Sequence, residues 1–196
     1  SAAVVRSRSR SRCSVSARSK ASPVTAAARE RARAMAKRRC SPPNARDHCP
    51  AVSIGTQRIQ LWDGTKLVRE WPCSTSRFGI GFVEGSNKTP LGGFVVRAKH
   101  GAGAERGTIF KAREPVGVWR EGQETKDDLV LTRILRLDGI EVRNANTFDR
   151  YIYIHGTNDE PGIGRCGSHG CVRMRNADVI ELYDQVPEGA PVWISE

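Results

Sequence analysis

The sequence predicts a mainly β domain, a small sandwich or barrel with one short C-terminal helix. Short apolar runs alternate with polar residues and are separated by glycine-rich turns, which is typical of strands. A single segment has helical spacing, whereas a parallel sheet with crossover connections needs several helices. With 196 residues the chain is long enough for one core, and we expect residues 48–196 to form this domain.

The strand candidates follow one another from residue 51. In "VSIGTQRIQLWDGTKLVREWPCSTS" two alternating runs flank Asp63-Gly64, a dipeptide that favours the tight turn of a β-hairpin. Further candidates are residues 92–100, 107–114, 129–139, 150–156 and 190–194. At least six strands are therefore expected.

The helix is predicted over residues 176–186, "NADVIELYDQV". Asn176 is the expected N-cap, and Pro187 ends the segment. Apolar residues recur at helical spacing at Val179, Ile180, Tyr183 and Val186.

The positive charge of the chain is confined to its first 47 residues. The formal net charge is +11, and residues 1–47 hold 13 Lys and Arg against 2 acidic residues, so residues 48–196 are electrically balanced. The segment is rich in Ser, Arg and Ala, without aromatic residues or apolar periodicity, and we predict a disordered tail. No specific nucleic-acid partner is expected, and weak binding of the tail to an anionic polymer remains open.

Several common function classes find no support. The clusters "FGIGFVEGS" and "HGAGAERGT" lack the context of a nucleotide loop, and the six cysteines lack metal-finger spacing, so neither a cofactor nor a metal is expected. The adjacent acids Asp127-Asp128 and Asp159-Glu160 are interpreted as solvated loop residues. No apolar run matches a membrane span or a secretory signal.

One stretch concentrates reactive side chains: "HGTNDEPGIGRCGSHGCVR", from His155 to Arg173. His155 ends a predicted strand, and a glycine-dense loop then delivers Cys171 to the start of another strand. An imidazole can take the proton of a thiol, and both His155 and His169 are available. This composition favours a cysteine nucleophile that performs acyl transfer.

Two other interpretations stay open at this stage. His155, His169 and Cys171 could hold zinc, although no established ligand spacing is present. Alternatively, Cys171 is a buried and inert cysteine in a glycine-rich turn.

The motifs together resemble the L,D-transpeptidases with a YkuD-type catalytic domain, bacterial enzymes that remodel peptidoglycan. The resemblance rests on "HGT", "SHGCVRM", "NADVIELYDQVPEGAPVWI" and the earlier "TPLGGF", and it covers about residues 51 to 196. It implies that Cys171 attacks the bond before the terminal D-alanine of a tetrapeptide stem, forms a thioester and passes the acyl group to an amine. Peptidoglycan stem peptides would be the partners, carbapenems the covalent inhibitors, and cell-wall cross-linking and cell shape the processes served.

The resemblance also implies roles for individual residues. His155 would be the base for Cys171, oriented by the backbone carbonyl of Gly156. Ser168 and His169 would lie on the substrate side, and the N–H groups of Gly170 and Cys171 would form the oxyanion site. Arg173 stands where other branches of the family carry Asn, and we expect it to bind a carboxylate of the stem peptide.

Some properties are left as expectations. A monomer in the periplasm or cell wall is expected from the family, although the sequence carries no visible signal peptide. Water as acceptor would make the protein an L,D-carboxypeptidase, and loss of catalysis would leave a peptidoglycan-binding module. Cys166 lies five residues before Cys171, and a disulfide between the two would inactivate the thiol.

Overall fold

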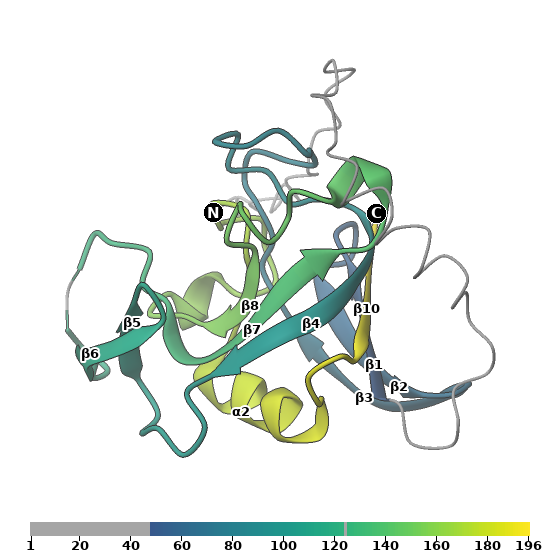
Figure 1. The fold of residues 1–196 in the computed structure, drawn as a ribbon. Coiled ribbons are helices and arrows are strands. Elements are labelled where there is room, and N and C mark those ends of the chain that lie inside the picture. The colour runs from purple at the N-terminus through teal and green to yellow at the C-terminus, as the bar shows by residue number, and fades with distance from the viewer. Residues whose placement is uncertain (1–47, 124) are drawn as a thin grey trace, which may run out of the picture.

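The computed structural model describes residues 48–123 and 125–196. The predicted tail, residues 1–47, lies outside the described residues. The described part contains ten strands, two short 3-10 helices and one α-helix (Figure 1). The strands are β1 His48–Ser53, β2 Arg58–Asp63, β3 Lys66–Pro72, β4 Gly92–His100, β5 Thr108–Lys111, β6 Glu114–Val118, β7 Leu131–Gly139, β8 Tyr153–Gly156, β9 Val172–Met174 and β10 Pro191–Ser195. The helices are η1 Val142–Asn144, η2 Glu160–Gly162 and α2 Asn176–Gln185.

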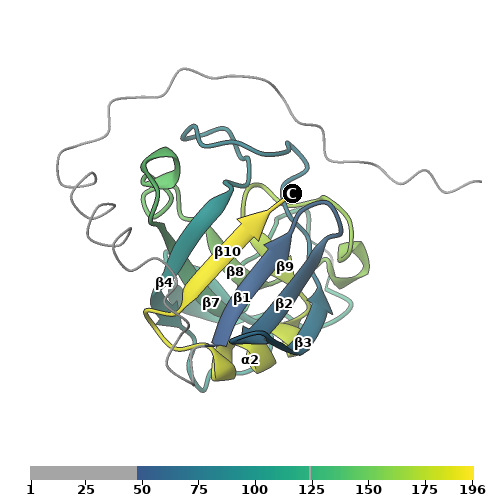
Figure 2. The ribbon, with the colours of Figure 1, turned by 90° about the vertical axis from the view of Figure 1, so that its right-hand side faces the viewer.

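All ten strands belong to one hydrogen-bonded sheet. Its order is β3-β2-β1-β10-β4-β7-β5-β6, and β8 pairs with β7 while β9 pairs with β8. The pairs β1–β10 and β8–β9 are parallel, and the other pairs are antiparallel. The sheet curls so that β7, β8 and β9 lie behind β10, β1 and β2 in the second view (Figure 2). The mainly β prediction with one C-terminal helix is confirmed.

The core fills the space that the curled sheet and α2 enclose. Buried side chains from β1, β2, β4, β7, β8, β9, β10 and α2 form one apolar cluster. The inward residues alternate along the strands, as in β10, where Val192 and Ile194 are buried and Trp193 is exposed. Helix α2 covers one end of the sheet with Val179, Leu182 and Tyr183 (Figure 1).

The strand positions predicted from the sequence agree well with the structure, but the predicted N-cap of the helix is wrong. The hairpin at Asp63-Gly64 joins β2 to β3, and β4 spans the predicted residues 92–100. The first predicted run is in fact two strands, β1 and β2, because the chain turns back between Ser53 and Arg58. Asn176 does not cap α2: Arg175 is the N-cap residue, and the Asn176 side chain instead contacts neighbouring strands and loops.

No α-helix within residues 48–123 and 125–196 is long and apolar enough to span a bilayer.

Candidate active site

Cys171 lies at the end of the glycine-rich loop, directly before β9. Its Sγ accepts a hydrogen bond from the N–H of Tyr153 and donates one to the carbonyl oxygen of Tyr151, with both heavy-atom distances 3.4 Å. The side chain is half-buried and the thiol is free. The backbone around β8 therefore holds the sulfur in one position.

His155 shares a face of the sheet with Cys171 because β8 and β9 are parallel and in register. Ile154 pairs with Val172 and His155 with Arg173, and the members of a pair point to the same side. Ile154 and Val172 point into the core. Since side chains alternate along a strand, His155, Arg173 and Cys171 point to the opposite side. Strand pairing thus places the distant histidine on the same face of the sheet as Cys171.

The ring of His155 is fixed by its neighbour. Its Nδ1 lies 2.7 Å from the backbone carbonyl oxygen of Gly156, and the residue is only 2% exposed. A carbonyl only accepts hydrogen bonds, so Nδ1 carries the proton and Nε2 is the basic nitrogen. The catalytic roles predicted for His155 and Gly156 stay predictions.

Burial governs the protonation of both groups. Desolvation raises the pKa of the Cys171 thiol to about 12, against smaller opposing effects of the Tyr153 N–H and of Arg150 and Arg173. Desolvation also lowers the pKa of His155, partly offset by the hydrogen bond to Gly156. At neutral pH the pair therefore consists of a thiol and a neutral imidazole.

Gly156 tolerates no side chain where it lies. A Cβ atom there would collide with Oδ1 of Asn176 and with the carbonyl oxygen of Leu131. Asn176 is buried at the start of α2, accepts a hydrogen bond from Thr132 at 2.5 Å and donates one to the carbonyl of Thr157 at 2.8 Å. The beginning of the helix thereby holds the end of β8, where His155 and Gly156 lie.

Ser168 braces the loop that carries the thiol. The residue is fully buried, its hydroxyl donates to the carbonyl of Cys171 at 2.6 Å, and it accepts the N–H of Gly170 at 3.2 Å. Gly170 has a φ of 122°, a conformation that favours glycine, and its carbonyl accepts a hydrogen bond from Thr89. The roles predicted for Ser168 and Gly170 in substrate and oxyanion binding stay predictions.

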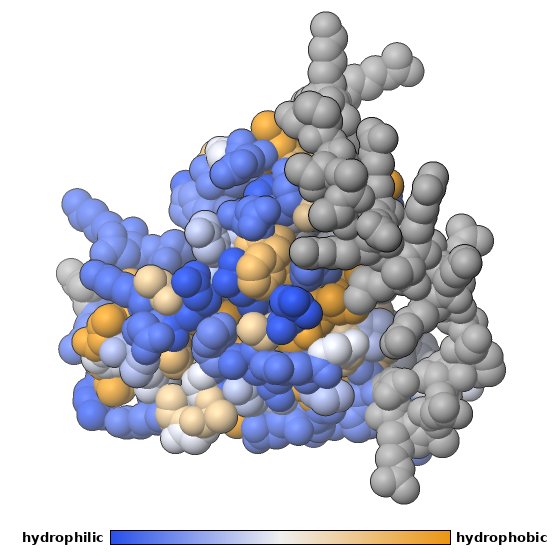
Figure 3. Space-filling view, in the orientation of Figure 1, coloured by the Kyte–Doolittle hydropathy of each residue, from blue (hydrophilic) through white to orange (hydrophobic). Residues whose placement is uncertain are grey.

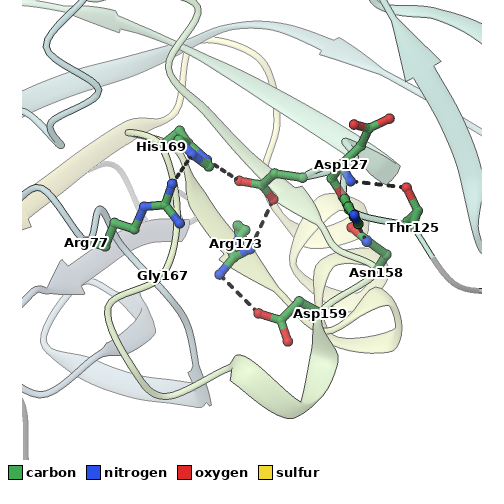
Figure 4. A pocket seen from close by; sticks show the side chains of 10 residues that line it. Arg77, Thr125, Asp127, Asn158, Asp159, Gly167, His169 and Arg173 are labelled. Atoms are coloured by element: carbon green, nitrogen blue, oxygen red, sulfur yellow. Dashed lines mark hydrogen bonds and ion pairs between the residues drawn. The ribbon is translucent and has the colours of Figure 1, made fainter.

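Asp128 joins His169 to Arg173. Its Oδ2 lies 3.0 Å from Nδ1 of His169 and its Oδ1 lies 3.0 Å from a guanidinium nitrogen of Arg173 (Figure 4). On its other side His169 lies 2.7 Å from Arg77, between Nε2 and the guanidinium. Burial raises the pKa of Asp128, but the His169 hydrogen bond and the Arg173 charge outweigh it and hold the pKa below its usual value.

The interpretation of Asp128 as a solvated loop acid is wrong, since its side chain is 22% exposed and pairs with Arg173. Asp159 also pairs with Arg173, but its side chain stays half-exposed, as predicted. No sequence pattern signals the contact between Asp128 and Arg173, because local patterns do not reveal that the segment before β7 faces the loop before β9.

Arg173 is only 5% exposed at its side chain, and a second carboxylate, that of Asp159, lies 3.4 Å from it. Its charge is therefore balanced within the protein. Binding of a substrate carboxylate by Arg173 stays a prediction.

A pocket of about 210 Å³ opens beside this ion network (Figure 4). Neither Cys171 nor His155 lines it, but the charge of Asp128 acts on both. The lining residues are Arg77, Thr125, Lys126, Asp127, Asp128, Asn158, Asp159, Gly167, His169 and Arg173. Asp128 and Arg173 thus line the pocket and also act on the charge of the thiol.

Within the described part of the chain no group of three or more His, Cys, Asp or Glu residues is arranged to hold a metal ion. Because Cys171 is a free thiol, the disulfide hypothesised between it and Cys166 is not formed in this structure.

The comparison with protein families decides the assignment. Residues 51–194 match the family model of the L,D-transpeptidase catalytic domain, YkuD. The chain belongs to this family. The resemblance seen in the sequence is thereby confirmed, and the match covers the strands, the glycine-rich loop and α2.

Relatives with known names match over shorter stretches. YkuD of Bacillus subtilis is 55% identical over 21% of this chain and 26% of its own length, and ErfK/SrfK of Salmonella typhimurium is 34% identical over 41% and 36%. The chain therefore spans well under half of these L,D-transpeptidase relatives. An Enterococcus faecium L,D-transpeptidase structure, a C442S mutant, aligns over 76% of this chain and 50% of its own at 19% identity and a TM-score of 0.49.

Proposed function

We propose that this protein is a peptidoglycan L,D-transpeptidase with Cys171 as its nucleophile. The observation that carries the proposal is the free Cys171 thiol on the same sheet face as a buried His155, whose Nδ1 is tied to the carbonyl of Gly156. That bond leaves Nε2 as the nitrogen able to take the thiol proton.

The reaction proceeds in two acyl transfers. Sγ of Cys171 attacks the carbonyl between the L-centre of the diamino acid and the terminal D-alanine of a tetrapeptide stem, while His155 accepts the thiol proton. The tetrahedral intermediate collapses, the C–N bond breaks, and His155 returns the proton to the departing D-alanine. An amine acceptor then attacks the thioester, His155 takes a proton from it, and the thiol is regenerated.

The Cys171 N–H is the favoured donor to the oxyanion. In this structure the N–H of Gly170 already donates to the Ser168 hydroxyl within the loop. One such donor contributes about 2.7–4 kcal/mol to the transition state in a comparable acyl-transfer site. Ser168 would then act by holding the Cys171 peptide group in position.

The remaining features follow from the family. The substrate would be peptidoglycan in the periplasm or cell wall, and the products would serve cross-linking or remodelling. Water as the acceptor would give an L,D-carboxypeptidase, and a protein that binds stem peptides without acylation would be a peptidoglycan-binding module. The division into a tail of residues 1–47 and a catalytic domain of residues 48–196 is part of the proposal.

Intact-protein mass spectrometry tests the proposal. The full chain is incubated with a tetrapeptide stem or with a carbapenem, and the mass is followed with time. We expect a covalent adduct with each compound, and we expect Cys171→Ala to abolish both adducts. A second free cysteine gives the matched control: Cys73→Ala replaces a fully buried thiol and should leave the adduct in place.

The outcomes separate the alternatives. D-alanine release with an amine-linked product indicates the transpeptidase, and a free tripeptide indicates the carboxypeptidase. Binding of the tetrapeptide without adduct or product, with Cys171 reduced, would contradict the proposal and favour the binding module.

A further inference from the structure

The arginines beside Cys171 fall into two groups with different partners. On the pocket side, Arg173 is paired with the carboxylates of Asp128 and Asp159. On the side of Tyr151 the arginines contact aromatic rings and carbonyls instead. No ion pair among the described residues involves Arg113, Arg136 or Arg150. The charge of these three arginines is thus not neutralised by an ion pair, although Glu114 acts on Arg113 and Glu84 on Arg150 without forming one.

Arg113 reaches this side from the turn between β5 and β6. Ala112 and Arg113 have positive φ values of 49° and 71°, as in the two-residue turn that matches the twist of a hairpin. The guanidinium donates to the hydroxyl of Tyr153 at 3.4 Å and lies 5.6 Å from the centre of the Tyr151 ring. The carboxylate of Glu114, the next residue, also acts on the charge of Arg113.

Arg136, on β7, lies against the same ring. Its guanidinium is 5.1 Å from the centre of the Tyr151 ring and 3.4 Å from that of Phe148, and it donates to the Phe148 carbonyl at 2.9 Å. Nε of Arg136 is buried without a hydrogen-bond partner. A half-buried guanidinium that contacts rings and one carbonyl remains able to attract an anion.

Tyr151 connects this cluster to the reacting atom. Its carbonyl accepts the hydrogen bond of the Cys171 thiol, its backbone has a φ of 55°, and its side chain is 54% exposed. Strained residues of this kind concentrate at functional sites. The face that carries β7, β8 and the β5–β6 hairpin is largely hydrophilic (Figure 3). The cluster is therefore open to a polar ligand. It is connected to the thiol through Tyr151, whose backbone contacts Sγ.

We propose that Arg113, supported by Arg136 over the Tyr151 ring, binds the free carboxylate of the acyl donor's terminal amino acid. The inference rests on the function proposed above. That carboxylate lies on the leaving residue, a few bonds from the attacked carbonyl, so its subsite has to adjoin the nucleophile. A guanidinium binds a carboxylate through two parallel hydrogen bonds, and Arg113 uses one long hydrogen bond within the protein.

Two donors that differ only at this carboxylate test the subsite. One is a tetrapeptide stem with a free terminal carboxylate, and the other is the same peptide as its carboxamide. We expect Arg113→Gln to lower kcat/KM for acylation about 10- to 100-fold with the carboxylate donor, the usual effect of losing hydrogen bonds to a charged group. With the carboxamide donor we expect a change of at most about twofold, since no charge is bound there.

Arg97→Gln is the matched control, because Arg97 is an exposed arginine on β4. It should leave both donors unaffected. Arg113→Lys should give an intermediate loss, because an ammonium keeps the charge without the planar fork. Unfolding in urea, measured for each variant, shows that the fold is retained.

The outcomes distinguish the two levels of the proposal. If the wild-type protein forms no thioester with either donor, the function itself fails. If the wild type is acylated and Arg113→Gln affects both donors equally, or neither, the carboxylate subsite alone is overturned.

Discussion

At the scale of single residues, burial decides how Cys171 and His155 are charged. Many reactive cysteines are activated as thiolates beside a cation, but here desolvation opposes the charged form of both groups. The Tyr153 N–H and the nearby arginines reduce the effect on the thiol without cancelling it. In the proposed mechanism the nucleophile would therefore form only as His155 removes the proton during attack.

The pH dependence of alkylation checks this protonation state. We expect the rate of Cys171 modification by iodoacetamide to rise about tenfold per pH unit from about pH 6 to about pH 9, since the thiolate fraction still increases there. The rate is followed by mass spectrometry of the peptide that contains Cys171. Carrying out the series in Cys49→Ser removes a second half-buried cysteine of the described residues. A plateau below pH 7 would show instead that a thiolate–imidazolium pair is already formed.

At the scale of elements, two pairings assemble the site. The parallel pair β8–β9 brings His155 beside the end of the cysteine loop, and the segment between β6 and β7 contributes Asp128. Asp128 contacts His169 at one oxygen and Arg173 at the other. This one carboxylate therefore links the cysteine loop, β9 and the segment before β7.

Replacement of Asp128 tests that link. Asp128→Asn leaves the nearly buried Arg173 with the weaker partner Asp159, and we expect it to lower the free energy of unfolding by about 1–3 kcal/mol at pH 7. Urea unfolding measures the loss. Because the folded-state pKa of Asp128 is lowered, its stabilising charge is kept down to about pH 4 and is lost as the pH falls further through the folded-state pKa, so the difference between the two proteins should shrink only below about pH 4.

The adjacent residue supplies the control. Asp127→Asn alters a carboxylate without an ion pair among the described residues and should change the stability by less than about 0.5 kcal/mol. An equal loss in both variants would mean that general charge, rather than the contact with Arg173, is responsible.

At the scale of the whole molecule, the apolar core packs against the face of β8 and β9 that is opposite the site. Ile154 and Val172 pack into the core while their neighbours His155 and Arg173 face the site. Leu135 and Leu137 of β7, both fully buried, pack in the same cluster. The positions of Cys171 and His155 therefore depend on the same packing that stabilises the fold.

Core truncation should show this dependence. Leu137→Ala removes a fully buried side chain, and we expect it to lower the free energy of unfolding by about 2–5 kcal/mol through lost burial and the cavity left behind. Leu67→Ala on β3 deletes the same atoms from a residue that is 43% exposed, and should cost less than about 1 kcal/mol. Thermal and urea unfolding both measure the difference, and similar losses in the two variants would contradict the assignment of the core.

The sequence by itself determined the class of the fold, most strand positions, the helix and the two motifs that hold Cys171 and His155. These features depend on local periodicity, on turn residues such as Asp63-Gly64, and on short motifs, all of which are visible within a few residues.

Only the tertiary structure decided which distant residues meet. Asp128 and Arg113 each occupy a turn or connecting segment with no distinctive local pattern, and their contacts with Arg173 and Tyr151 arise from the order of strands in the sheet. The protonation of the thiol was likewise undecided, because it depends on how much water the packed β8–β9 region excludes. Strand pairing and burial are long-range properties, so a short stretch of sequence does not contain them.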